Sequence, residues 1–275
     1  MIDQEVLIQR SFELEPLSPT VIRLAALIRD PESDLQEVAA VAGRDPALAG
    51  SLIRVANSAR YGASREIGTV ADAVIRVGAG LTLDIATRAS VRKTVDRSLS
   101  EYGYTEGMFW QHSCGAAIAA DSLRRRSQTP LPAEVSTAAL LHGIGKLAMA
   151  QFLAPELLQL LGRAREGGLS EIEAEREVLG VDHAEVGGLI AQHWQLPDTI
   201  RIGVTYQHDP AQDETGIASV VHLANVVAGR AFSVPGQDGA PCPAALQQLG
   251  MSADEFEEMA ARICHDLEED PDLFG

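Results

Sequence analysis

Five of the seven histidines stand where an imidazole could do chemistry. Each lies in or just after an apolar stretch that is typical of a buried helix. These residues are His112, His142, His183, His208 and His222. A buried imidazole costs free energy unless its ring nitrogens have partners, and imidazole is also a frequent metal ligand. The set therefore indicates either histidines that hydrogen-bond one another inside a core or a site for a metal ion.

Two charged residues adjoin these histidines. Lys146 follows His142 by one helical turn, and Asp209 directly follows His208. The lysine could contact a phosphate or pair with a buried acid, and the sequence leaves both roles open. If the histidines converged in one pocket with Asp209, their neutral imidazoles would favour zinc, copper or nickel over magnesium. The ligands of such a transition metal would be His112, His142, His183 and His208.

The stretch LLHGIGKLAM, residues 140–149, combines an apolar helix pattern with two glycines beside His142. Glycine inside a helix costs about 0.5–1 kcal/mol relative to alanine. Gly143 and Gly145 therefore need a compensating reason, and close packing against another helix would supply one. We expect one helix over residues 133–153 that accommodates both glycines.

Apolar residues recur with helical spacing along nearly the whole chain. Residues 18–30 follow the i, i+3, i+4, i+7 pattern of one helix face, with Ser18 as the cap and Pro19 in the first turn. Strand signals are nearly absent, because aromatic residues are few and no alternating run is bounded by tight-turn residues. The pattern predicts an all-α protein. Further helices are expected at 34–62 and 69–90, each as two helices, and at 108–126, 133–153, 154–167, 170–180, 182–194, 197–208, 215–232 and near 252–268.

The charge and composition of the chain argue against several classes of protein. The 275 residues carry a formal net charge of −17, and a strongly acidic protein repels a phosphate backbone, so nucleic acid is a disfavoured partner. No apolar run is long enough to span a membrane. The N-terminus lacks the features of a secretory signal, which predicts a cytoplasmic protein. The three scattered cysteines, without a C-x-x-C pair, predict reduced thiols.

Several words of the sequence, in their order and spacing, resemble the helical HD superfamily of metal-dependent phosphohydrolases. In the second half these words are FWQHS, ALLHGIGKL, DHAEVGGLIAQHWQLP, YQHD and VVHLAN. Within that superfamily the chain is similar to the HDOD branch, a relative of the HD-GYP phosphodiesterases. In the first half RDPAL and LIRVANSARYG are the words most typical of HDOD domains.

The resemblance covers residues 14–232 and implies a domain organisation. An N-terminal helical subdomain at 14–100 would pack on an HD-like helical subdomain at 105–232. Residues 1–13 would form an N-terminal helix or extension. Residues 233–275 would form a C-terminal loop and an acidic helix.

The resemblance also implies that the metal site of the superfamily is degraded here. His112 matches the first ligand histidine and His142 the histidine of the HD dyad, but Gly143 stands where the aspartate of that dyad should be. Asn225 stands where a final aspartate ligand should be. Glycine has no ligating side chain, and neutral asparagine is a poorer ligand than aspartate for Mg²⁺ or Mn²⁺. We therefore expect no catalytic residue and no cofactor.

Three further positions match the family. His183 and His208 correspond to histidines that the HD-GYP relatives use, and Gln207 replaces a second histidine beside the latter. Lys146 fits the word HD-x-G-K. These residues could persist as a pocket without the original metal.

The function that the resemblance implies is a non-catalytic regulatory module of bacterial signal transduction. It would act through signalling protein partners, or through a nucleotide-like ligand in the old site. The alternative is a residual metal-dependent phosphohydrolase or phosphodiesterase that acts on a nucleotide or cyclic dinucleotide with a transition-metal ion. A third and weaker reading is DNA binding through residues 44–62, which look superficially like a helix-turn-helix.

Overall fold

The computed structural model describes residues 4–58, 66–95, 99–234 and 239–269, and these contain helices and no strand. The N-terminal part comprises α1 (Gln4–Ser11), α2 (Pro19–Arg29), α3 (Leu35–Ala42), α4 (Pro46–Ala56), α5 (Val70–Val95) and the short 3-10 helix η2 (Ser100–Tyr102). The remainder comprises α6 (Met108–Arg126), α7 (Val135–Leu141), α8 (Ile144–Phe152), α9 (Pro155–Glu166), α10 (Glu171–Leu179), α11 (His183–His193), α12 (Asp198–Tyr206), η3 (Pro210–Gln212), α13 (Ile217–Ala231), α14 (Pro243–Gln248) and α15 (Ala253–Glu269). The all-α prediction is confirmed.

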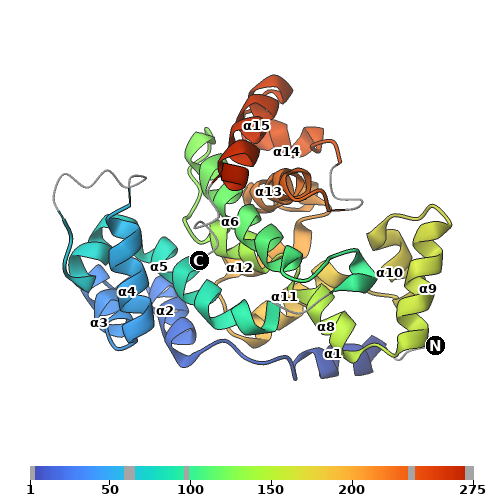
Figure 1. Cartoon of the computed structure of the whole chain (residues 1–275), viewed down its shortest axis with the longest axis horizontal. Helices are drawn as coiled ribbons and strands as arrows, with labels where there is room; N and C mark the ends of the chain where they lie inside the picture. Colours follow the sequence, from blue (N-terminus) through green and yellow to red (C-terminus); the bar gives the residue numbers. More distant parts are fainter. Residues whose placement is uncertain (1–3, 59–65, 96–98, 235–238, 270–275) are drawn as a thin grey trace.

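Helices α2 to α5 form one side of the molecule (Figure 1). Ser18 caps α2, as predicted, and Asp34 and Glu37 form a reciprocal capping box at the start of α3. The expected break in 69–90 falls at Gly78, whose φ of 84° interrupts α5. Part of the helix-turn-helix-like stretch, residues 59–62, lies outside the described residues.

The second half of the chain packs around a core of buried helices. Helix α6 lies against α7 and α13, and α11 lies against α8 and α12. Trp110 and Trp194 are both buried in this core. These helices carry the candidate histidines on their inward faces or at their ends.

One predicted helix is wrong. Residues 133–153 form two helices, α7 and α8, which are separated at His142 and Gly143. The Lys146 amide donates to the Gly143 carbonyl at 3.0 Å rather than to His142. The freed His142 carbonyl instead accepts a hydrogen bond from Gln207 Nε2 at 2.7 Å. The break is thus stabilised by a side chain from a distant helix, and Gly143 does not lie inside a helix.

The chain ends are also helical. Helix α1 lies against α8 and α11, apart from α2 to α5 (Figure 1). Here Phe12 stacks on His193 with ring centroids 4.5 Å apart. The acidic C-terminal helix expected near 252–268 is α15, whereas α14 was not predicted. None of the described helices is long and apolar enough to cross a bilayer.

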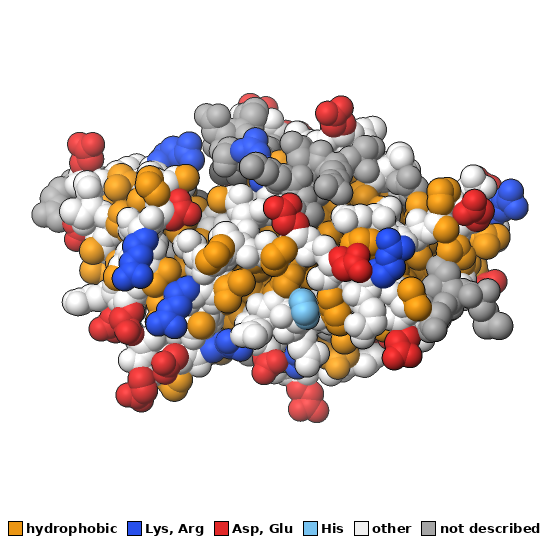
Figure 2. Space-filling model, turned by 90° about the horizontal axis from the view of Figure 1, so that it is seen from below, with side chains coloured by type: hydrophobic (Ala, Val, Ile, Leu, Met, Phe, Trp, Pro, Cys, Tyr) orange, Lys and Arg blue, Asp and Glu red, His pale blue; other side chains and the backbone are white. Residues whose placement is uncertain are grey.

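Acidic and basic side chains are mixed on the surface. Figure 2 shows red and blue side chains scattered among apolar atoms on the face that it presents, without a single large patch of either sign.

Candidate functional site

The first histidine pair joins three helices. His112 from α6 places its Nε2 3.2 Å from Nε2 of His142, at the end of α7, and 2.9 Å from Asn225 Oδ1 on α13. His142 Nδ1 lies 2.6 Å from the Ala139 carbonyl, which can only accept, so Nδ1 carries the proton of a neutral His142. Nε2 of His142 is then an acceptor, and His112 Nε2–H is the donor that His142 and Asn225 share.

Both rings of this pair are neutral. Burial, and after it the electrostatic repulsion that a protonated His112 would meet from His142 and Lys146, holds the pKa of His112 well below its ordinary value. Burial lowers the pKa of His142 to about 3, because it outweighs the hydrogen bond to Ala139. A neutral pair inside the core needs no counter-ion, which suits a site without carboxylates.

The second histidine pair rests on a glutamate. Glu175 on α10 accepts from both the backbone N and the ring Nδ1 of His183 through Oε2, each at 2.8 Å. In a neutral His183 that donates from Nδ1, Nε2 is the acceptor, and His208 Nε2 lies 3.0 Å away as the donor. Burial alone would raise the pKa of Glu175, but the interactions with His183 outweigh burial and lower it. The result is a chain of carboxylate, imidazole and imidazole, in which Glu175 and His183 are buried and His208 is exposed.

Sequence reasoning missed Glu175. It stands in an acidic stretch, EIEAEREVL, that looks like a solvated helix surface. One signal was present: Glu175 lies between Ala174 and, four residues on, Leu179, which are both buried. An acid on the apolar face of an amphipathic helix needs a partner, and that partner is His183.

Lys146 takes the ion-pair role of the two that the sequence left open. Its Nζ lies 2.6 Å from Glu171 Oε2, and its side chain is only 2% exposed. The ammonium also lies over the rings of Tyr102 and Tyr104, at 5.5 and 5.7 Å from their centroids. Burial would lower the pKa of Lys146, but Glu171 and the neighbouring groups outweigh burial and raise it.

Two of the singled-out residues lie apart from both pairs. Asp209, which the sequence placed beside the pocket, is exposed, and its Oδ2 accepts from Gln212 Nε2 at 2.7 Å. His222 donates from Nδ1 to the Gln207 carbonyl at 2.9 Å and accepts from the Cys242 amide at 3.2 Å. His222 thus ties α13 to the segment that follows α12 and to the start of α14.

The residues present do not fit the metal centre of the HD superfamily. A Cβ on Gly143 would lie 2.7 Å from the nearest ring carbon of Phe109, so an aromatic ring takes the space of an aspartate side chain there. Asn225 offers an amide oxygen that already accepts from His112. Among the residues that the structure describes, no group of three or more His, Cys, Asp or Glu side chains is arranged to hold a metal ion. A hard dication would find no pair of carboxylates here.

Comparison with known proteins identifies a family and several proteins that this chain resembles. Residues 14–210 match the family described as "HDOD domain". An uncharacterized protein of Treponema pallidum (strain Nichols) is 26% identical over 233 residues, which are 78% of this chain and 42% of that protein. The chain therefore spans less than half the length of this curated relative.

Three solved structures share the fold. An HDOD domain protein of unknown function from Geobacter sulfurreducens has a TM-score of 0.68 at 24% identity, over 97% of this chain and 99% of that one. A Shewanella amazonensis SB2B protein, whose name suggests a phosphohydrolase, has a TM-score of 0.70 at 25% identity, over 96% and 97%. A Marinobacter aquaeolei VT8 protein, whose name suggests signal transduction, has a TM-score of 0.74 at 24% identity, over 99% and 65%.

Proposed function

The chain belongs to the HDOD domain family, and on that basis we propose that it is a non-catalytic regulatory module that acts in signal transduction. It binds a protein partner or a ligand and carries out no phosphoester hydrolysis. The observation that carries this proposal is the Phe109 ring beside Gly143. The ring takes the space that the missing aspartate would need, so more than one side chain must change to rebuild the metal site.

The electrostatics of the pocket support the same proposal. Ring nitrogens of both histidine pairs contact each other, Asn225 and Glu175. Lys146 is neutralised by Glu171. A metal-dependent phosphohydrolase needs cations that polarise the phosphate and activate a water, and the groups that would hold them are absent or already engaged.

Metal content is the first test of this proposal. The purified chain, with any tag removed and without chelator, is dialysed and measured by inductively coupled plasma mass spectrometry. We expect far less than one equivalent of any transition metal. Close to one equivalent would contradict the proposal and would show that the imidazoles still ligate.

The partner side of the proposal is tested by affinity capture. A chain with net charge −17 favours a partner with a basic contact surface. The tagged chain should retain a specific protein that an untagged control does not, and rising ionic strength should release it because salt screens exposed charges. Failure to recover any specific partner under mild salt would count against the proposal.

A second candidate function, residual phosphodiester hydrolysis, is favoured by one observation. His142 and His183 each hold the Nδ1 proton against a fixed acceptor, Ala139 O and Glu175 Oε2, so each presents an unprotonated Nε2. This is the tautomer in which a histidine ligates through Nε2. Turnover of bis-p-nitrophenyl phosphate or cyclic di-GMP, with zinc added, that disappears in His142→Ala would support this candidate. Turnover unchanged by that substitution would exclude it.

A further inference from the structure

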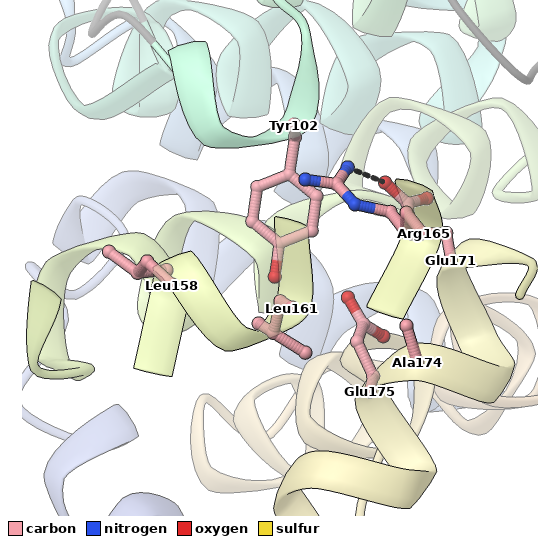
Figure 3. A pocket seen from close by; sticks show the side chains of 7 residues that line it. All are labelled: Tyr102, Leu158, Leu161, Arg165, Glu171, Ala174 and Glu175. Carbon is pink, nitrogen blue, oxygen red and sulfur yellow. Dashed lines mark ion pairs between the residues drawn. The ribbon is translucent and has the colours of Figure 1, made fainter. Parts of the chain in front are cut away.

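The small cavity between η2, α9 and α10 is already balanced in charge (Figure 3). Glu171 on its wall is paired with Lys146 at 2.6 Å and with Arg165 at 4.0 Å. Both cations also lie over the ring of Tyr102. The charges of the cavity are therefore matched within the chain, and a surface for a partner has to lie elsewhere.

Helix α1 lies on the outside of the second half of the chain, against α8 and α11 (Figure 1). It has eight residues, and an isolated helix shorter than about 12–15 residues is marginal in water. Leu7 and Ser11 are its buried residues, and Ile8 is half-buried. Because this one narrow stripe holds α1 in place, the helix depends on its contact with α8 and α11.

The end of α1 is anchored at the ends of the two helices beneath it. Arg10 Nη1 donates to the Phe152 carbonyl at 3.3 Å, and the guanidinium lies 5.2 Å from the centroid of the Phe152 ring. Phe152 ends α8, and the last carbonyls of a helix favour a cation. Phe12 stacks on His193, which ends α11. The surface beneath α1 therefore fits a helix with an apolar stripe, an arginine and an aromatic ring.

The connection from α1 to α2 has anchors of its own. Residues 12–18 contain no helix. Leu14 and Leu17 in this connection are only 1% and 3% exposed. These two leucines can stay buried when α1 leaves its surface, so α1 can open while α2 to α5 keep their places. Local opening of such a unit requires less free energy than unfolding of the whole chain.

We propose that the surface of α8 and α11 beneath α1 is a docking site for an amphipathic helix of a protein partner, and that α1 occupies it in the resting chain. The partner helix carries the pattern of α1, which is a leucine followed by an arginine, a small residue and an aromatic ring. This inference deepens the proposed regulatory function and rests on it for the existence of a partner. Helix α8 directly follows His142 and Gly143, and α11 begins at His183. Exchange of α1 for the partner therefore acts on the two helices that adjoin the histidine pairs.

A labelled peptide of residues 4–15 stands in for the partner helix, and fluorescence anisotropy measures its binding to the full chain. The parent chain should bind the peptide weakly, because its tethered α1 competes at an effective concentration of about millimolar. Leu7→Asp in the full chain removes this competitor, so it should bind the peptide at least about tenfold more tightly than the parent. Val6→Asp places the same charge on the exposed side of α1 and should bind as weakly as the parent. A folded Leu7→Asp chain that binds no better than Val6→Asp would overturn the proposal.

Hydrogen exchange of the parent chain tests the same proposal without any variant. The hydrogen-bonded amides of α1 should exchange at least about tenfold faster than those of α8 and α11, because α1 opens alone. Equal protection of the three helices would overturn the proposal. A parent dimer in light scattering that Leu7→Asp abolishes would assign the surface to α1 of a second copy and overturn the assignment to a separate partner. Stoichiometric metal would contradict the proposed function but leave these peptide results unchanged, so the two failures can be told apart.

Discussion

Substituting Gly143 by alanine tests whether Phe109 takes the space that an aspartate side chain would need at this position. The added Cβ would lie 2.7 and 2.8 Å from two ring carbons of Phe109, well inside the usual 3.5–4.0 Å carbon contact. Phe109 cannot yield freely, because it is 1% exposed and packs edge-on against Tyr104 with centroids 5.0 Å apart. Overpacking of this kind costs about 1–3 kcal/mol. Gly143→Ala should therefore lower the free energy of unfolding by that amount.

The matched control is Gly162→Ala on α9. A Cβ there meets nothing within 4 Å, and the position lies inside the helix. Alanine should then stabilise the protein by about 0.5–1 kcal/mol, because it lowers the entropy of the unfolded chain. Urea unfolding followed by far-UV circular dichroism measures both variants against the parent. The two glycine-to-alanine changes should have opposite signs.

Gly143→Asp extends the same test to the metal. The aspartate brings the overpacking of alanine and also buries a charge, so its cost should exceed that of Gly143→Ala by about 1–3 kcal/mol. It should not recruit Mn²⁺ by itself, since Phe109 still fills the site and Asn225 remains neutral. A Gly143→Ala variant as stable as the parent, or stoichiometric Mn²⁺ in Gly143→Asp, would refute this reasoning.

Three further predictions concern neighbouring groups. Lys146→Met should change the free energy of unfolding by no more than about 1 kcal/mol, because the Glu171 carboxylate that it leaves is partly open to water. Glu171→Gln should lower the free energy of unfolding by about 3–5 kcal/mol, because it leaves a buried ammonium without its carboxylate. Equal losses for the two variants in urea unfolding would contradict this prediction. His112 and His142 have lowered pKa values when folded, so the unfolded state binds protons first. Stability is full above about pH 6.5 and should fall by about 2 kcal/mol by about pH 5 through His142, with His112 adding to the loss in the same direction. A flat profile over this range would exclude neutral buried rings. Gly145→Ala would place a Cβ against the His183 carbonyl oxygen, and it should lower the free energy of unfolding by more than about 4 kcal/mol. A variant that is soluble and as stable as the parent would disprove this close contact.

Most helices of this chain follow from local pattern, and the split of the helix predicted at 133–153 has a long-range cause. Apolar spacing and caps such as Ser18 and Asp34 are local, so they mark the helix ends without knowledge of the fold. The break at Gly143 is not visible in that pattern, because the apolar residues continue across it. It depends on Gln207, which takes the His142 carbonyl from 65 residues away.

In the site, the residues could be predicted from the sequence, but the way they pair could not. The words around His112, His142, His183 and His208 could be recognised from the sequence. Which histidine pairs with which, and through which nitrogen, depends on how α6, α7, α11 and α12 pack. Glu175 was not found because its one signal, the apolar neighbours Ala174 and Leu179, is weak in an acidic stretch until the packing shows that this face of α10 is turned inward.

One glycine of LLHGIGKLAM, Gly145, also brings the segments that carry the two histidine pairs close together. A Cβ on Gly145 would strike the carbonyl of His183, so the start of α8 and the start of α11 touch through backbone. The first pair ends at His142, just before α8, and the second begins at His183. Because backbone atoms make the contact between α8 and α11, a movement of one helix cannot be accommodated there by a change of side-chain rotamer. We therefore expect a change at Glu175 that moves His183 to be felt at α8 and at His142, which is the kind of coupling that the proposed regulatory function would use.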